Sequence, residues 1–364
     1  MKRSLRKDFD YRLLLLAVVI CLIGLVLLYS ASYQMSLVSG VSFVVRQMIW
    51  VVIGLSALLI VANINYRKLV EISYILYAIN LLLLVLVLFF GEVRLGAQRW
   101  LQLGNFGFQP SELAKVIIIL VLAKYLGERD SRHQQIKRIL VSLGIVAAAL
   151  ILILKQPDLG TAIVFLPILF CMLYVWGAQL KYLLGLVGIG LVSSPFLWHF
   201  LRDYQRQRLL VFLNPNIDPL GAGYTVIQSK IAIGSGGFLG KGWLAGTQNQ
   251  LNFLPEHHTD FIFSVLGEEW GFLGGIVLIL LYLFLINQGL KIAGQTKDLS
   301  GKLLAVGVTA MLGFQIIVNI GMSIGLMPIT GLTLPLVSYG GSSLLMTMIS
   351  IGILLSIKMR RTVF

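Results

Sequence analysis

The sequence predicts an all-α integral membrane protein with about ten transmembrane helices. Of its 364 residues, 58% are hydrophobic and only 12% are charged, whereas soluble domains carry about 25% charged residues. Mean hydropathy is correspondingly high, at +0.90. The apolar residues also gather into ten long stretches, and a helix needs about 20 apolar residues to cross a bilayer.

The ten stretches are spread along the whole chain. No repeat, low-complexity tract or linker interrupts them, so we expect residues 1–364 to form a single polytopic membrane domain. The first stretch is long enough to span and lacks a following cleavage site, which favours a membrane helix over a signal peptide. Cys21 and Cys171 lie inside apolar stretches, without disulfide or metal-site spacing. The predicted spans are 12–30, 44–62, 70–90, 112–126, 139–154, 160–178, 182–200, 261–288, 303–326 and 336–357.

Most charged residues lie in the loops between the predicted spans, and the balance of basic and acidic residues differs between the two sides of the membrane. An even number of spans places both termini on one side, and that side holds 19 of the 29 Lys and Arg residues against six acidic residues. The other side holds nine basic and nine acidic residues, and Lys115 falls within a span. Because cytoplasmic loops are enriched in Lys and Arg, both termini are predicted to be cytoplasmic. The net charge of +14 therefore indicates membrane topology and excludes a nucleic-acid patch.

Residues 201–260 form an unusually long connection on the outer side, between the seventh and eighth spans. Connections of this length are functional or disordered, and the aromatic residues here argue against disorder. Residues 223–243 could lie on the membrane surface as a short amphipathic helix. The glycine-rich stretch GSGGFLGKG does not match a phosphate-binding loop, since Ser235 stands where glycine is needed and Gly242 where Ser or Thr is needed.

The end of this connection, LPEHHTDFIF, holds the densest group of titratable residues. The adjacent pair His257 and His258 lacks the spacing of zinc ligands, although Glu256 and Asp260 could bind a hard cation through oxygen. Asp260 lies where the outer loop meets the eighth span. An ionisable group at that boundary is a candidate base, since partial burial raises a carboxylate pKa. It could equally be a helix cap.

A second group begins the fourth span in QPSELAK. Glu112 and Lys115 are three residues apart, hence on one helix face. Ser111 or Glu112 could merely cap the helix, but an unpaired lysine one turn into the membrane would be costly. We therefore expect a Glu112–Lys115 pair that lines an outward cavity.

Further charged residues from separate outer loops point to the same face. Arginine forks match phosphate and pyrophosphate geometry, so an outward cavity with carboxylates and several cations suits an anionic, lipid-linked substrate. The residues are Arg99, Lys155, Asp158, Arg202, Arg206 and Arg208.

Taken together, the motifs resemble the SEDS family (shape, elongation, division and sporulation). The resemblance covers the chain from the third to the tenth span in the family's order, and as a set it is very specific; the first 90 residues match only in hydropathy. The matching stretches are GAQRWL from Gly96, FQPSELAK from Phe108, QPDLGT from Gln156, DYQRQR from Asp203, DPLGAGYTVIQSKIAIGSGG from Asp218, GKGW from Gly240, LPEHHTDFIF from Leu254 and PLVSYGGSS from Pro335.

The resemblance implies a ten-helix peptidoglycan glycosyltransferase of the bacterial cytoplasmic (inner) membrane. Such an enzyme polymerises lipid II into glycan strands during cell elongation and rod-shape maintenance, with its site on the extracytoplasmic face. The implied partners are a class B penicillin-binding protein, which is the crosslinking transpeptidase, and other membrane proteins of the elongation complex. The aspartate of the outer-loop motif is essential in the family, which corresponds here to Asp260.

We therefore expect Asp260 to be the general base of an inverting, β-1,4-forming transfer. Pyrophosphate leaves without protonation, so the reaction needs cations rather than the acid of a glycosidase. A divalent cation, Mg²⁺ or Mn²⁺, could assist. The residues expected to bind substrate are Arg99, Glu112, Lys115, Lys155, Asp158, Arg202, Arg206, Arg208, Lys230 and Lys241.

Two alternatives remain open from the sequence. A lipid II flippase could use the same outward cavity, and prolines such as Pro195 and Pro328 would suit broken, moving helices. A non-catalytic scaffold for a transpeptidase would tolerate replacement of Asp260. The clustering of polar residues at one face favours the enzyme.

Overall fold

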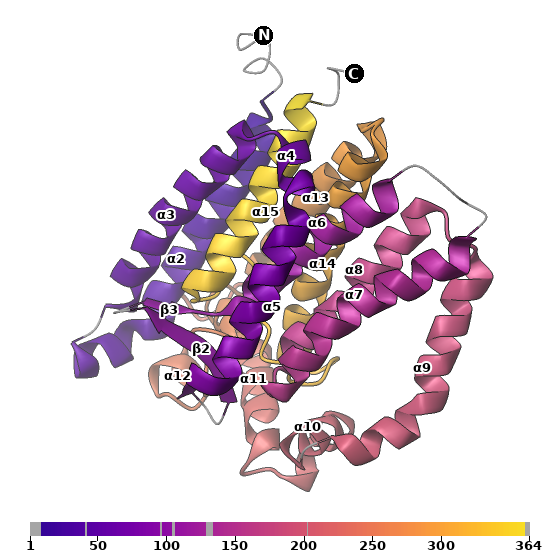
Figure 1. The fold of residues 1–364 in the computed structure, drawn as a ribbon. Coiled ribbons are helices and arrows are strands. Elements are labelled where there is room, and N and C mark those ends of the chain that lie inside the picture. Colours follow the sequence, from indigo (N-terminus) through magenta and orange to yellow (C-terminus); the bar gives the residue numbers. More distant parts are fainter. Residues whose placement is uncertain are drawn as a thin grey trace.

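The computed structural model describes residues 9–40, 42–94, 97–103, 106–128, 134–201 and 203–360. Helices dominate it, as predicted, and they pack as a bundle (Figure 1). Within the described residues, eight helices are long and apolar enough to cross a membrane. The all-α membrane prediction is therefore confirmed.

Ten helices coincide with the ten predicted spans. The two beyond the eight apolar ones are the charged helix α6 and α9, whose apolar part is only Leu180–Phe196. The ten are α2 (Tyr11–Ser39), α3 (Phe43–Asn63), α5 (Ser73–Phe90), α6 (Pro110–Gly127), α7 (Gln135–Lys155), α8 (Leu159–Trp176), α9 (Leu180–Phe200), α13 (Ile262–Gln295), α14 (Leu299–Ser323) and α15 (Gly341–Arg360).

Helices α6, α14 and α15 have the largest share of buried residues among the long helices and form the centre of the bundle. Helix α14 packs against α6, α8 and α13, and α15 packs against α3. The short helix α4 (Tyr66–Glu71) precedes α5. Helix α9 stands apart from the bundle in Figure 1 and contacts little besides α8. The start of α2 and the end of α15 lie at one end of the bundle, as an even number of spans requires.

The opposite end carries the long connection and a small sheet. Three short antiparallel strands, β1 (Glu92–Arg94), β2 (Ala97–Leu103) and β3 (Phe106–Phe108), lie in the order β1-β2-β3. The sequence analysis did not predict them. The connection folds into α10 (Asp203–Leu213), the 3₁₀ turn η2 (Pro215–Ile217), α11 (Ala222–Gly236) and α12 (Thr247–Gln250). It is therefore folded, as its aromatic residues predicted.

Helix α13 is broken at Gly271, whose φ of 64° and ψ of −161° are not helical. The glycine-rich segment after α11 fills this break. The amides of Lys241 and Gly242 donate to the carbonyls of Glu268 and Glu269, each at 3.0 Å. Beyond the break, the amides of Phe272 and Leu273 donate to the carbonyls of Gly237 and Phe238. Residues 237–242 therefore supply the backbone partners that the interrupted helix lacks.

Candidate active site

A cavity of about 860 Å³ opens at the end of the bundle that carries the sheet and the long connection. Aromatic rings of Trp50, Trp100 and Tyr339 form part of its wall, and flat apolar surfaces with a few convergent polar groups are typical of ligand sites. The charged residues of the wall come from both halves of the chain. They are Arg46, Arg99, Glu112, Asp158, Arg208, Glu256 and Asp260.

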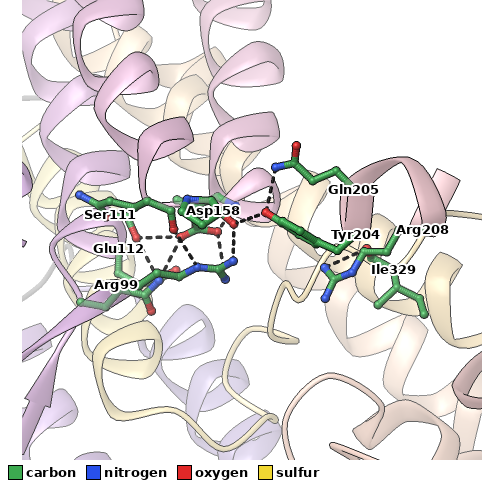
Figure 2. Close-up of polar contacts among 12 residues, drawn as sticks. Arg99, Ser111, Glu112, Asp158, Tyr204, Gln205, Arg208 and Ile329 are labelled. Atoms are coloured by element: carbon green, nitrogen blue, oxygen red, sulfur yellow. Dashed lines mark hydrogen bonds and ion pairs between the residues drawn. The ribbon is translucent and has the colours of Figure 1, made fainter. Parts of the chain in front are cut away.

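Arg99 and Asp158 hold one side of the cavity together (Figure 2). Arg99, on β2, donates to the carbonyls of Gln156 and Pro157, and its Nη1 lies 3.7 Å from Asp158 Oδ1. Asp158 caps α8 by accepting from the Thr161 amide at 3.2 Å, and Ser111 Oγ donates to its other oxygen at 3.1 Å. The pair therefore joins β2, α6 and α8 at the rim.

The predicted Glu112–Lys115 pair is present. Lys115 Nζ lies 2.7 Å from Glu112 Oε1, and only 2% of the lysine side chain and 9% of the glutamate side chain are exposed. Glu112 faces the cavity, whereas Lys115 is behind it and is not part of the described wall. Neither residue caps α6, which begins after Gln109 without a side-chain cap. Lys115 can therefore act on a ligand only through Glu112.

Arg208 projects from α10 toward the cavity. Its Nη1 donates to the Ile329 carbonyl at a long 3.4 Å, and the guanidinium lies 5.8 Å from the ring centre of Tyr204. Tyr204 in turn donates to the Pro157 carbonyl at 3.0 Å, which ties α10 to the Arg99 side (Figure 2). Burial lowers the pKa of Arg208, and the charge of Asp260 opposes this shift. Because this single hydrogen bond is long, most N–H groups of the Arg208 guanidinium remain available to bind an anion.

Asp260 lies in the turn before α13 and contributes its carboxylate to the cavity wall. The helix is capped at Phe261 without a side-chain bond, so the helix-cap role considered for Asp260 is wrong. Its backbone is fixed on both sides. Its amide donates to the Glu256 carbonyl at 3.0 Å, and Asn319 Nδ2 donates to its carbonyl at 2.9 Å and to the Leu332 carbonyl at 2.7 Å.

The electrostatic surroundings of Asp260 suit a base. Burial, helped by the negative charge of Glu256, raises its pKa from 3.8 to about 6. The guanidinium groups of Arg208 and Arg99 and a hydrogen bond from Thr259 act in the opposite direction. A general base works best with a pKa near the operating pH, and a carboxyl group with a pKa of about 6 is mostly ionised at neutral pH.

The neighbouring histidines have structural contacts. Both ring nitrogens of His257 face backbone carbonyls, those of Leu254 at 2.6 Å and Ala31 at 2.8 Å. His258 packs against the rings of Phe43 and Tyr339. Across the described part of the chain, no group of three or more His, Cys, Asp or Glu residues could hold a metal ion. Glu256 and Asp260 still provide two carboxylates on one cavity wall.

Several residues predicted to bind substrate lie elsewhere. Lys155 and Lys230 are exposed and, like Arg206 and Lys241, are not part of the described cavity wall. Arg206 donates to the carbonyls of Trp198 and His199, and Lys241 pairs with Glu268 at 2.7 Å. Arg202 lies outside the described residues. Direct contact of these lysines and of Arg206 with a ligand in this cavity has no geometric support.

The cavity also contains residues that the sequence analysis missed. Arg46 lines it from the first turn of α3, and Tyr339 lines it from the PLVSYGGSS stretch before α15. Arg46 was one of the nine basic residues of the outer side, so charge topology could have identified it.

Comparison with known proteins places the chain among bacterial cell-wall proteins. The family described as "Cell cycle protein", FtsW/RodA/SpoVE, matches residues 11–363. Peptidoglycan glycosyltransferase MrdB of Escherichia coli is 43% identical over 355 residues, which are 97% of this chain and 94% of that protein. Peptidoglycan glycosyltransferase RodA of Treponema pallidum is 36% identical over 97% of this chain and 98% of its own.

Solved structures agree. One, from a study of polymerisation and crosslinking by a peptidoglycan synthase complex, matches with a TM-score of 0.83 and 39% identity, covering 97% of this chain and 98% of its own. The crystal structure of the rod shape determining protein RodA of Thermus thermophilus matches with a TM-score of 0.72 and 32% identity over the same shares.

Proposed function

The chain belongs to the FtsW/RodA/SpoVE (SEDS) family, and from that premise we propose that it is a peptidoglycan glycosyltransferase that polymerises lipid II into glycan strands. The observation that carries the proposal is the position of Asp260. Its carboxylate, with a pKa of about 6, shares one cavity with three arginines, Arg46, Arg99 and Arg208. A base beside fixed cations is what transfer of a sugar from a pyrophosphate carrier requires.

In the proposed step, Asp260 accepts the proton from the 4-hydroxyl of the acceptor sugar. The oxygen attacks the anomeric carbon of the donor sugar from the face opposite its lipid pyrophosphate. The bond from that carbon to the pyrophosphate breaks, and the carrier leaves with the bonding electron pair. The new β-1,4 bond has inverted configuration at the donor carbon.

The arginines have different tasks in this proposal. Arg208 has a largely free fork and faces the developing negative charge on the leaving pyrophosphate, where a fixed cation lowers the barrier most. Arg99 is bound to two carbonyls and to Asp158, so it shapes the wall and adds positive potential. A Mg²⁺ or Mn²⁺ ion would be held by Glu256, with phosphate and water as its remaining ligands, so that the Asp260 carboxylate stays available to accept the proton. Such an ion would neutralise charge on the pyrophosphate.

The sidedness of the site follows from the charge distribution. With both termini cytoplasmic, the cavity opens at the extracytoplasmic end of the bundle, where a sugar head group can enter while its lipid tail stays in the bilayer. The structural match to a peptidoglycan synthase complex supports a class B penicillin-binding protein as partner. That transpeptidase would crosslink the strands during cell elongation, as the similarity to RodA proteins suggests.

The test is lipid II polymerisation by the purified chain with its cognate transpeptidase. We would compare the wild type with Asp260→Asn, which keeps the size of the side chain and removes the base. Asp203→Asn is the matched control, because Asp203 is a fully exposed aspartate outside the described cavity wall. We expect glycan strands from the wild type and from Asp203→Asn and at least a hundredfold slower synthesis by Asp260→Asn.

Both variants must still bind the transpeptidase, so that lost activity is not lost folding. Equal polymerisation by Asp260→Asn and the wild type would refute the assignment of the base. If no protein polymerises but lipid II crosses vesicle membranes, the transport alternative replaces the enzyme.

A further inference from the structure

A second polar cluster lies away from the cavity, where the outer segment 241–250 meets helix α13. Its centre is the adjacent pair Glu268 and Glu269, which are 0% and 1% exposed. Glu268 Oε1 accepts from Lys241 Nζ at 2.7 Å, from Thr247 Oγ1 at 3.1 Å and from the Gln248 amide at 3.1 Å. Ser30 of α2 donates to Glu269 Oε1. One oxygen of each carboxylate is thus well supplied with donors.

The other oxygens of this cluster lack a hydrogen bond of ordinary geometry, and the Leu244 amide and the Asn249 side chain lie near the Glu269 carboxylate without closing one to its second oxygen. Glu268 Oε2, Glu269 Oε2, Gln248 Oε1 and Asn249 Oδ1 are all buried without a hydrogen bond. Asn249 is only 2% exposed, and its Nδ2 is bound to the Ser30 carbonyl at 3.1 Å, which holds it beside the pair. Buried acceptors of this kind are rare, because each one costs free energy. Four such oxygens lie on two segments that pack against each other, which indicates that a positively charged ligand binds between them.

Gly246 packs directly against the two carboxylates. It is buried, and an added Cβ would lie 2.9 Å from Glu268 Oε2 and 3.3 Å from Glu269 Cγ. Its φ of −70° and ψ of 108° are accessible to any residue. The backbone conformation therefore does not require glycine here, but the close approach to Glu268 does, so Gly246 lets segment 241–250 pack against the carboxylate oxygen that lacks a hydrogen bond.

The charge of the cluster points the same way. Two buried carboxylates face one lysine, Lys241, so one negative charge is uncompensated among the residues described. Buried charges are ordinarily paired or coordinate a metal. The open atoms are all oxygens, two from carboxylates and two from side-chain amides, which is a ligand set of hard cations. The 26% exposed side chain of Lys241 connects the cluster to the surface.

We propose that Glu268, Glu269, Gln248 and Asn249 bind a divalent cation beside Gly246, at a site separate from the catalytic cavity. Ca²⁺ fits better than Mg²⁺, because Ca²⁺ accepts irregular sets of protein oxygens, whereas Mg²⁺ keeps several waters. The ion joins the outer segment 247–250 to the first part of α13 and, through Ser30, to α2. Since Asp260 immediately precedes α13, the site stabilises the element that carries the base.

The experiment measures cation binding directly and needs no polymerisation. The full chain in detergent is stripped with EDTA, exchanged into buffer, and dialysed against radioactive Ca²⁺, with Mg²⁺ as competitor. All proteins carry Glu256→Gln and Asp260→Asn, which removes the two cavity carboxylates considered above as cation ligands; Glu112 and Asp158 are engaged by Lys115 and Arg99. We expect one Ca²⁺ per chain and a rise in melting temperature with CaCl₂, with Mg²⁺ competing weakly.

Two variants test the site by different means. Glu269→Gln removes a ligand charge and keeps the shape, and Gly246→Ala presses a Cβ against Glu268 Oε2 without removing a ligand. Each is expected to weaken Ca²⁺ binding at least tenfold. Gly234→Ala is the matched control, because a Cβ at this glycine of α11 meets nothing within 4 Å; it should bind Ca²⁺ like the parent.

Three results would overturn the proposal. The parent protein could bind no Ca²⁺, or Glu269→Gln could bind it unchanged. Alternatively, the melting temperature could rise on acidification and ignore Ca²⁺, which would show that a shared proton satisfies the open oxygens. If Gly246→Ala fails to fold, as judged by gel filtration and transpeptidase binding, Glu269→Gln decides the question alone.

Discussion

Asp260 can act as a base only when it is deprotonated, so the pH dependence of polymerisation should report its pKa. With a pKa of about 6, roughly nine tenths of the enzyme is competent at pH 7 and roughly one tenth at pH 5. The initial rate should therefore fall about tenfold between these values. Because burial raises the pKa of this acid, the competent form is present above pH 6 and is lost as the pH falls.

The surroundings of Asp260 allow the assignment to be tested in both directions. The charge of Glu256 raises the pKa of Asp260, and the charge of Arg208 lowers it. Glu256→Gln should therefore move the midpoint of the rate profile to lower pH, and Arg208→Gln should move it to higher pH. Both variants are expected to be slower, so the readout is the midpoint and not the maximal rate.

The assay follows the initial rate of labelled lipid II polymerisation from pH 4.5 to 8 at saturating substrate. A sample held at pH 5 and returned to pH 7.5 must recover full activity, which excludes acid denaturation. A wild-type rate that stays nearly constant down to pH 4.5, as a carboxyl group with the ordinary pKa of 3.8 would give, would refute the desolvated base. Identical midpoints in the wild type and both variants would show that another group controls the rate.

Three further predictions concern stability. The raised pKa means that charging Asp260 costs about 3 kcal/mol at most, so Asp260→Asn should melt at higher temperature than the wild type at pH 7.5, with the difference vanishing near pH 4. Lys115→Met leaves Glu112 buried and unpaired and should lose about 3–5 kcal/mol, part of which the added Glu112→Gln change restores in thermal melts. Gly271→Ala would place a Cβ 2.3 Å from a backbone nitrogen of the docked segment 237–242 at a φ of 64°. It should lose roughly 1–3 kcal/mol and speed proteolysis of that segment, whereas Gly144→Ala, with open space around it, should not.

Hydropathy was enough to predict the spans, because each helix must bury about 20 apolar residues in lipid. The helix with buried charges shows the limit of that signal. Residues 112–126 were predicted as a span, but the corresponding helix α6 contains Glu112 and Lys115 and is not among the eight described helices that are apolar enough to cross on composition; the two charges neutralise each other at 2.7 Å. The three strands over residues 92–108 were missed. They are too short for a clear alternation of apolar and polar residues, and they pair only with one another.

The sequence predicted that the site residues gather at one end of the helices, but it did not predict which of them contact one another. Arg99, Asp158, Arg208 and Asp260 were expected on the outer side, and the fold brings all four into one cavity wall. Lys241 was expected there as well. It pairs with Glu268 instead, because residues 237–242 dock against α13. That docking depends on a helix break at Gly271, which no local pattern distinguishes from an ordinary helical glycine.

The break in α13 explains why a glycine-rich segment without a phosphate-loop pattern is present at all. A helix interrupted inside a membrane leaves amides and carbonyls that no water can satisfy. Gly240 comes so close to the break that a Cβ there would lie 2.1 Å from the Glu269 carbonyl oxygen, so only a glycine backbone can deliver the required bonds. The same docking buries Glu268 and Glu269 beside Lys241. The outer segment and the first part of α13 therefore form one unit, and Asp260 is held at its edge by bonds from Asn319 and to Glu256. Because Asp260 is fixed through its backbone and its carboxylate lines the cavity, the proposed base would meet the acceptor hydroxyl without reorganisation of the protein.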